Sequence, residues 1–375
     1  MAATERHRAT RRLAVAAAAL AVAALTLTPA TAAPDDYLLV FGDIHNHTRY
    51  SDGWEGTPED AYVHARASGA DFLATSDHNF MLTEEEWDLT KSQAGAQTDG
   101  DFAALPASEY WITNGFGEVI VLDHEGIRTK ANWRGPRTSL SRHEVIADFY
   151  DWLADRGAIG HWAHPGLYGD LDDLRHHTPR RDAAMSSIEI HNYGSWVGAP
   201  ANWGVHDYEE WYVLALDRGW HVMPAAVSDT HSPDWISGSP VRTVLLVESL
   251  TPGAIYDAMR ASRGYATLDE NLRVRYTLNG NVMGSLLSAG GSSYTATIDL
   301  VDPDGTPEDE ITLVELISDH GAVVASEATS GTDVSVSFDV SSSTSRYYYV
   351  RVTTASDVTA GPGVTAWTAP VWTGR

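Results

Sequence analysis

The chain contains no cysteine among its 375 residues. Disulfide cross-links are therefore excluded, and so is a lipid anchor attached through an N-terminal cysteine. Basic residues are also scarce, with 25 Lys and Arg against 51 Asp and Glu and a formal net charge of −26. Because such an acidic surface repels polyanions, we do not expect nucleic acid as the substrate. Solubility outside the cell is an alternative reason for the acidity.

A long apolar run occurs only near the N-terminus. Residues 13–28 are apolar, arginines precede them, and small residues follow at 30–33. This order is typical of a secretory signal peptide over residues 1–33, and the run is short for a membrane span. The adjacent Arg11 and Arg12 favour twin-arginine export, with an ordinary Sec signal as the alternative. We therefore expect a secreted protein without stable membrane insertion, whose oligomeric state the sequence leaves open.

Two regions with different patterns follow the signal segment. Over residues 34–271, short apolar strands alternate with helical stretches, which is typical of a parallel α/β fold. An amphipathic helix is predicted over residues 142–154. Over residues 272–375, several segments alternate polar and apolar residues between turn-rich stretches. This region predicts an antiparallel β-sandwich with a packing role, and carbohydrate or cell-wall binding is the alternative.

Two histidines follow the first expected strand, residues 37–41. His45 and His47 are two positions apart, so in extended chain their side chains point to the same side. Two imidazoles suit a borderline divalent cation, and Asp52 in the next turn offers an oxygen ligand. A His-x-His pair alone is a weak signal.

Five further strand ends carry side chains of the same chemistry. They are Asp77-His78, Glu109, His161 with His164, Glu189 with His191, and Asp229 with His231. In a barrel of parallel strands, all carboxyl ends open on one face. A single histidine beside a strand is more often a packing residue than a ligand, but a series of such clusters indicates a metal site.

In order and spacing, the motifs around His45-x-His47, Glu109 and Asp229-x-His231 resemble those of the polymerase-and-histidinol-phosphatase (PHP) metalloesterases. The resemblance is strongest to the secreted, carbaryl-hydrolase-like branch, and it covers about residues 38–270. It implies a distorted (β/α)7 TIM-like barrel of the PHP type, which holds two or three Zn²⁺, Mn²⁺ or Fe ions at its mouth.

The resemblance also implies a ligand set. The matching residues are His45, His47, Asp52, His78, Glu109, His164, Asp229 and His231, with Glu109 bridging two ions. The chain departs from the family at Glu118, where members commonly have a histidine. Glu118 is thus a candidate oxygen ligand, with His124 or His191 as alternative sources of a nitrogen, and a two-metal site is an alternative to three.

The amidohydrolases are a competing family that also begins with His-x-His. Their two-metal members usually bridge the ions through a carboxylated lysine. This chain has only Lys91 and Lys130, and neither follows a plausible barrel strand. A bridging Glu109 fits the sequence better.

These residues predict a secreted metal-dependent phosphoesterase that cleaves a small organic phosphate mono- or diester by attack of a metal-bound hydroxide. His231 or His191 would protonate the leaving oxygen. Arg242 would clamp the phosphate, with a structural salt bridge as the alternative. Two other functions stay open: a metal-dependent carboxyl-ester or carbamate hydrolase on the same scaffold, and a non-catalytic metal-stabilised binding protein.

Overall fold

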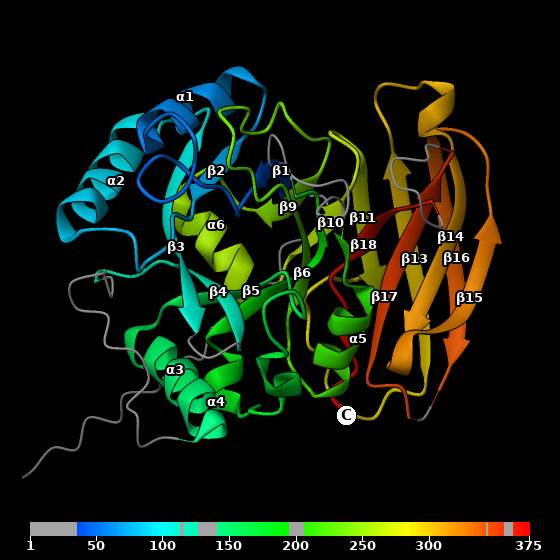
Figure 1. The fold of residues 1–375 in the computed structure, drawn as a ribbon. Coiled ribbons are helices and arrows are strands. Elements are labelled where there is room, and N and C mark those ends of the chain that lie inside the picture. Colours follow the sequence, from blue (N-terminus) through cyan, green and yellow to red (C-terminus); the bar gives the residue numbers. More distant parts are fainter. Residues whose placement is uncertain (1–35, 113–115, 127–140, 195–205, 343, 356–362) are drawn as a thin grey trace, which may run out of the picture. The chain divides into compact units, whose positions relative to one another are not determined.

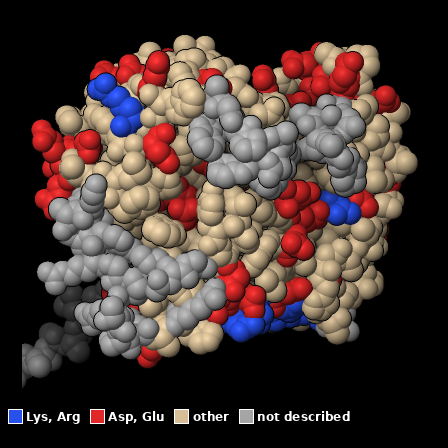
Figure 2. Space-filling view, in the orientation of Figure 1, with Lys and Arg blue, Asp and Glu red and all other residues tan. Residues whose placement is uncertain are grey.

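The computed structural model describes residues 36–112, 116–126, 141–194, 206–342, 344–355 and 363–375 (Figure 1). The predicted signal peptide, residues 1–33, lies outside the described residues, so secretion stays a prediction. Among the described residues, no helix is both long and apolar enough to cross a membrane. Figure 2 shows acidic side chains over several parts of the face in view and basic ones at only a few places.

The first region is built on strands that are buried along most of their length. One parallel set contains β1 (Leu38–Asp43), β2 (Phe72–Thr75) and β3 (Ala103–Ile112). A second contains β5 (Ile159–Ala163), β6 (Met185–Asn192) and β8 (Met223–Val227). Continuous apolar runs of this kind are typical of strands covered on both faces, as the sequence predicted.

Four of the described strands break the predicted parallel order, and one of them is the two-residue β7 (His206–Asp207), which runs antiparallel to β6. β4 (Gly117–Leu122) runs antiparallel to both β3 and β5, and β9 (Arg242–Val247) runs antiparallel to β1 and to β10 (Gly264–Thr267). The expected parallel arrangement is therefore wrong at these strands, whereas it is confirmed for the pairs β1–β2, β2–β3, β5–β6 and β6–β8. For β4 the reason is local, because only residues 113–116 separate it from β3 and a parallel return needs about a dozen residues.

The longer helices begin at strong capping signals. Capping boxes at Thr57, Thr83 and Ser141 precede α1 (Pro58–Ala67), α2 (Glu84–Gln97) and α3 (Arg142–Arg156). The predicted helix over 142–154 is confirmed as α3, which ends where Gly157 adopts a left-handed conformation with φ 62°. Three shorter helices complete the region: α4 (Pro179–Asp182), α5 (Glu209–Asp217) and α6 (Pro252–Arg260).

The large sheet continues past residue 271. β10 pairs with β18 (Val364–Thr368), and the sheet then runs through β17 (Tyr347–Thr354) and β14 (Ile311–Ser318) to β15 (Ala322–Ala328) (Figure 1). Residues 33–375 accordingly form one compact unit by their contacts. The boundary between residues 271 and 272 stays a prediction.

A second, four-stranded sheet lies in the C-terminal region. Its strands are β12 (Asn281–Val282), β11 (Arg273–Leu278), β13 (Ser293–Val301) and β16 (Asp333–Ser341). Exposed and buried residues alternate along β13 and over most of β16, which is the predicted period-two pattern. The coarse fold is therefore mixed α/β, with strands far outnumbering helices in the described chain.

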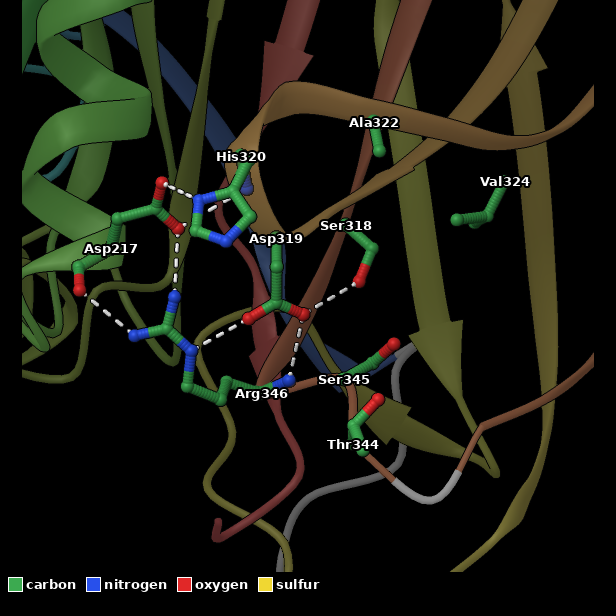
Figure 3. A pocket seen from close by; sticks show the side chains of 9 residues that line it. All are labelled: Asp217, Ser318, Asp319, His320, Ala322, Val324, Thr344, Ser345 and Arg346. Carbon is green, nitrogen blue, oxygen red and sulfur yellow. Dashed lines mark hydrogen bonds and ion pairs between the residues drawn. The ribbon is translucent and has the colours of Figure 1, made fainter.

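An ion-pair network joins α5 to the C-terminal strands (Figure 3). The guanidinium of Arg346 donates to Asp217 at 2.8 Å and to Asp319 at 2.6 Å, and His320 Nδ1 lies 2.7 Å from Asp217. Burial opposes the charge of Arg346, but these carboxylates raise its pKa. These residues line an open hollow of about 600 Å³. Their charges are paired with one another, so the network has a structural role.

Candidate metal centre

The predicted ligands come together where the strands of the first region end. Backbone hydrogen bonds fix this arrangement: Asp229 N donates to His45 O at 3.0 Å, and His47 N donates to Thr230 O at 2.9 Å. His78, three residues after the end of β2, forms a parallel bridge with Glu109 of β3. His45, His47, Glu109 and His164 are buried. Residues scattered over the sequence thus form one cluster of imidazoles and carboxylates.

Glu109 lies at the centre of the cluster. Its Oε1 atom lies 3.4 Å from His45 Nε2 and 3.0 Å from His164 Nε2. Its Oε2 atom lies 3.3 Å from His47 Nε2 and 3.0 Å from His78 Nδ1. Burial raises the pKa of Glu109, but the positive charges of His45 and His78 outweigh it and hold the pKa well below its usual value. Because each oxygen faces a different pair of imidazoles, this carboxylate is placed to bridge two cations.

One group of donors consists of His45, His164 and Asp229. Asp229 Oδ1 lies 3.1 Å from His45 Nε2 and 3.2 Å from His47 Nε2. Asp229 and His164 both have positive φ angles, 48° and 23°. Such angles are uncommon for residues other than glycine and concentrate at functional sites. The backbone is therefore held in an unfavourable conformation where it presents these two ligands.

A second group consists of His47, Asp52, His78 and His231. Asp52 lies 3.4 Å from both His78 Nε2 and His231 Nε2, through different oxygens. Burial opposes the charge of Asp52, but hydrogen bonds from these two histidines lower its pKa. The turn that carries it requires Gly53, because a Cβ there would lie 2.6 Å from the Thr48 backbone.

Glu118 reaches the cluster from β4. Its Oε2 atom lies 3.5 Å from His164 Nε2, and its Oε1 atom lies 3.8 Å from His78 Nδ1. Burial and the charge of Glu109 raise its pKa to about 7. The alternative donor His124 is instead stacked on Trp87, with ring centroids 4.9 Å apart, and burial lowers its pKa to about 4. The geometry favours Glu118 over His124 as the additional donor.

Glu189 contacts the cluster, although the predicted ligand set did not include it. Its Oε1 atom accepts from His45 Nδ1 at 2.7 Å, and its Oε2 atom accepts from the His164 amide at 2.7 Å. Burial raises its pKa, but the charge of His45 and the hydrogen bond from His161 outweigh this and lower it to about 2. Because His45 donates from Nδ1, its Nε2 lone pair faces Glu109 and Asp229. Glu189 therefore positions a ligand.

The backbone of β6 is irregular after Glu189. The register between β6 and β8 shifts between Glu189 and His191, which marks a β-bulge. The side chain that turns inward after Glu189 is Asn192, whose amide donates to Glu189 at 3.0 Å and to Asp229 at 3.2 Å. The role of His191 as a leaving-group acid stays a prediction.

The buried guanidinium of Arg242 binds its own loop. Its Nη1 atom donates to the carbonyls of Ser239 and Val241, both at 2.8 Å, and Glu270 lies 4.0 Å from Nη2. Burial lowers its pKa, and Glu270 opposes that change. These contacts favour the structural alternative over the predicted phosphate clamp.

His231 lies at the edge of the cluster. Its ring stacks on that of His47, with centroids 4.1 Å apart, and it remains partly exposed. Burial lowers its pKa, but Asp52 and Asp229 outweigh this and raise it. Both predicted roles, ligand and proton donor, suit this position.

The donor set fits divalent cations. Within the described residues, Asp52, Glu109 and Asp229 form ion pairs only with histidines, never with Lys or Arg. His45 Nε2 and His47 Nε2 lie 3.2 Å apart and face the same carboxylates, while their Nδ1 atoms contact Glu189 and Ser51. Two imidazole lone pairs that converge beside several carboxylates form a typical cation site.

No protein-family model matches the chain, and no curated protein matches it. Solved structures do show likenesses, each at low identity. One is a two-domain protein from Bacteroides vulgatus ATCC 8482 that contains a predicted PHP-like metal-dependent phosphoesterase; it has 15% identity and a TM-score of 0.45, over 90% of this chain and 96% of that chain.

Two further structures cover a smaller part of the chain. An amidohydrolase from Chromobacterium violaceum has 17% identity and a TM-score of 0.34, over 51% of this chain and 87% of that chain. A candidate metal-dependent phosphoesterase from Bifidobacterium adolescentis ATCC 15703 has 18% identity and a TM-score of 0.33, over 58% of this chain and 94% of that chain. At these identities and TM-scores the likenesses carry no functional argument.

Proposed function

We propose that the chain is a secreted metal-dependent hydrolase that cleaves phosphate mono- or diesters of small organic molecules. The observation that carries this proposal is Glu109, whose two oxygens each face a different pair of imidazoles within 3.0–3.4 Å. Two or three Zn²⁺, Mn²⁺ or Fe ions held there would polarise the phosphoryl oxygens and lower the pKa of a water molecule.

The ligands in this proposal come from both donor groups. They are His45, His47, Asp52, His78, Glu109, Glu118, His164, Asp229 and His231. Glu189 fixes the ring of His45, and Asn192 fixes the carboxylate of Asp229. Where His231 is not bound to a cation, its exposed edge can deliver a proton to the leaving oxygen.

Tyr168 adds a substrate contact that the sequence reasoning did not include. It is half-exposed, and its ring centroid lies 5.1 Å from that of His164 in an edge-on arrangement. Burial and the charges of Asp229 and Glu118 raise its pKa to about 12, so the phenol keeps its proton. A neutral hydroxyl at this place can donate a hydrogen bond to a substrate oxygen.

A second candidate function is hydrolysis of a carboxyl ester or carbamate on the same scaffold. It is favoured by the contacts of Arg242, which binds backbone carbonyls instead of facing the cluster. Within the described residues, no Lys or Arg pairs with the ligand carboxylates. A site with little cationic side-chain charge suits an uncharged ester.

The finer fold belongs to the same proposal. We propose a distorted (β/α)7 TIM-like barrel that closes between β8 and β9, where Thr243 Oγ1 donates to Ala226 O at 2.9 Å. We propose a β-sandwich for the C-terminal sheets, because Tyr276 of β11 donates to Tyr348 O of β17 at 3.0 Å.

Turnover assays of the purified chain, loaded with Mn²⁺ or Zn²⁺, test the function. We expect turnover of aryl phosphates or aryl phosphodiesters, and a loss of about 100-fold or more in Glu109→Gln and Asp229→Asn. The control is Glu144→Gln, since Glu144 is an exposed capping residue of α3. Turnover of aryl acetates or aryl carbamates alone would establish the second candidate instead. Bound metal without any turnover would indicate a binding protein and overturn both.

A further inference from the structure

A second set of metal-ligating side chains lies outside the centre described above. His143 Nδ1 lies 2.5 Å and His176 Nε2 lies 2.6 Å from the same oxygen of Asp172, Oδ2. His143 belongs to the first turn of α3, and the other two residues belong to the connection between β5 and β6. We propose that His143, Asp172 and His176 bind a zinc ion or a similar divalent cation, which cross-links α3 to this connection.

The chemistry of the three donors selects the class of cation. Two imidazoles and one carboxylate suit Zn²⁺, Ni²⁺ or Cu²⁺, whereas Ca²⁺ and Mg²⁺ prefer oxygen ligands. One donor atom of each residue lies within 4.8 Å of the others. In bound zinc, nitrogen ligands lie about 2.0–2.1 Å from the metal, so both rings must move away from Asp172 Oδ2 to admit the ion. The side chain of His143 is 62% exposed and has room to do so.

The backbone presents Asp172 in an unusual conformation. Leu171, Asp172, Asp173 and Leu174 all have positive φ angles, 45–55°, so this segment forms a left-handed turn without glycine. Such a conformation is unfavourable for residues other than glycine. Leu171 and Leu174 are buried in the core, and Trp220 Nε1 donates to Leu174 O at 2.8 Å. The core thus holds the turn in place, and the turn holds Asp172 against α3.

The exposed fraction of the side chain decreases from His143 to His176 and then to Asp172. The side chain of Asp172 is 8% exposed and that of His176 is 16% exposed, so the carboxylate lies at the base of a site that opens beside His143. Within the described residues, Asp172 forms ion pairs with these two histidines and with no Lys or Arg. Three protein ligands and an open side leave room for water to complete the coordination.

This role suits a chain that has no disulfides. The connection between β5 and β6 covers residues 164–184 and contains only a four-residue turn and the four-residue helix α4. A cation that binds only the folded chain stabilises it in proportion to the logarithm of its concentration. The cross-link therefore ties a connection of little regular structure to the long helix α3.

The test is the zinc content of the full chain after exhaustive dialysis, measured in the Glu109→Gln background to separate this site from the hydrolytic centre. We expect His143→Gln and Asp172→Asn each to lose one zinc equivalent and the zinc-dependent rise in Tm that belongs to it. The control is His320→Gln, because His320 is also an exposed histidine, 2.7 Å from Asp217, without a second imidazole.

Two measurements distinguish this second metal site from the proposed hydrolase function. In the wild-type background, His143→Gln is expected to keep its turnover of aryl esters while it loses the zinc equivalent. His143 is exposed, so its replacement leaves the fold intact, which circular dichroism checks. Equal zinc content and equal zinc-dependent Tm in His143→Gln and His320→Gln would overturn the proposal, whether or not the chain hydrolyses esters.

Discussion

At the scale of single residues, His45 shows how the orientation of a ligand depends on a second side chain that binds its other ring nitrogen. Its Nδ1 atom is bound to Glu189, and this contact decides that Nε2 faces the other donors. Glu189 also accepts from the His164 amide, so one buried carboxylate positions parts of two ligands. Residues in this outer position commonly affect metal affinity almost as strongly as the ligands do.

Replacing Glu189 by Gln is therefore expected to weaken metal binding by about 10–100-fold. The amide can still occupy the space, but it holds the His45 tautomer less firmly and removes a charge. Competition with a metal-binding dye measures the affinity. Glu144→Gln serves as the control, and equal affinity in the two variants would mean that Glu189 has no positioning role.

The pH dependence of the metal-free chain follows from His164 and Glu118. Burial lowers the pKa of His164, but Glu109 outweighs it and raises the pKa to about 9; the pKa of Glu118 is raised to about 7. Between about pH 5 and pH 9 the folded chain therefore binds more protons than the unfolded chain, so stability falls as pH rises. We expect a Tm several degrees lower at about pH 9 than at about pH 6.

Zinc should reverse this loss, because the cation replaces the protons in the cluster. Thermal unfolding with and without zinc, at both pH values, measures the effect. A metal-free Tm that is constant or rises over this range would contradict the assigned shifts.

The predicted ligands depended on residue type and order, which the sequence contains directly. The role of His191 was predicted from its place in a strand-end cluster, and the bulge after Glu189 changes which side chains of β6 reach the other ligands. No glycine or proline marks this bulge, since the residue between Glu189 and His191 is Ile190. The sequence therefore did not indicate that Asn192 contacts Glu189 and Asp229.

At the scale of elements, local signals were the most informative. The amphipathic pattern over residues 142–154 predicted α3, whereas strand direction depends on distant partners and was predicted wrongly for β4 and β9. The left-handed turn at Leu171–Leu174 has no glycine to signal it, because the surrounding core imposes it. Helices that depend on neighbouring residues were predictable, whereas strand direction and the left-handed turn, which depend on the packed core, were not.

Two exposed glycines give opposite predictions for the helices they belong to. Gly95 lies inside α2, and Gly157 ends α3 with φ 62°; an added Cβ meets no atom within 4 Å at either place. We expect Gly95→Ala to stabilise the chain by about 0.5–1 kcal/mol. We expect Gly157→Ala to destabilise it by about 1–2 kcal/mol, because the residue is left-handed. Urea unfolding measures both, and changes of the same sign would contradict these backbone assignments.

At the scale of the whole molecule, the large sheet and the Arg346 network join the two predicted regions. The sheet passes from β10 to β18, and Arg346 connects Asp217 of α5 with Asp319 (Figure 3). The change of sequence pattern near residue 272 predicted where strands begin to dominate. That change of pattern did not indicate that β10 pairs with β18, because the two strands lie roughly a hundred residues apart along the chain.

Arg346→Ala is expected to lower the free energy of unfolding by about 1–2 kcal/mol, since it leaves two carboxylates without their shared donor. Arg273→Ala in the exposed first position of β11 is the matched control, with an expected change within about 0.5 kcal/mol. Denaturant unfolding compares the two variants. An equal effect would mean that the network does not fasten α5 to the strands.

The pairing of β10 with β18 also sets an order of events during synthesis. Tyr265 and Thr368 are partners although roughly a hundred residues separate them along the chain. While the ribosome makes that stretch, β10 has an unpaired edge, and such edges invite pairing with other chains. The nascent protein therefore stays vulnerable until β18 emerges, and a chain that stopped at residue 271 would keep that open edge permanently.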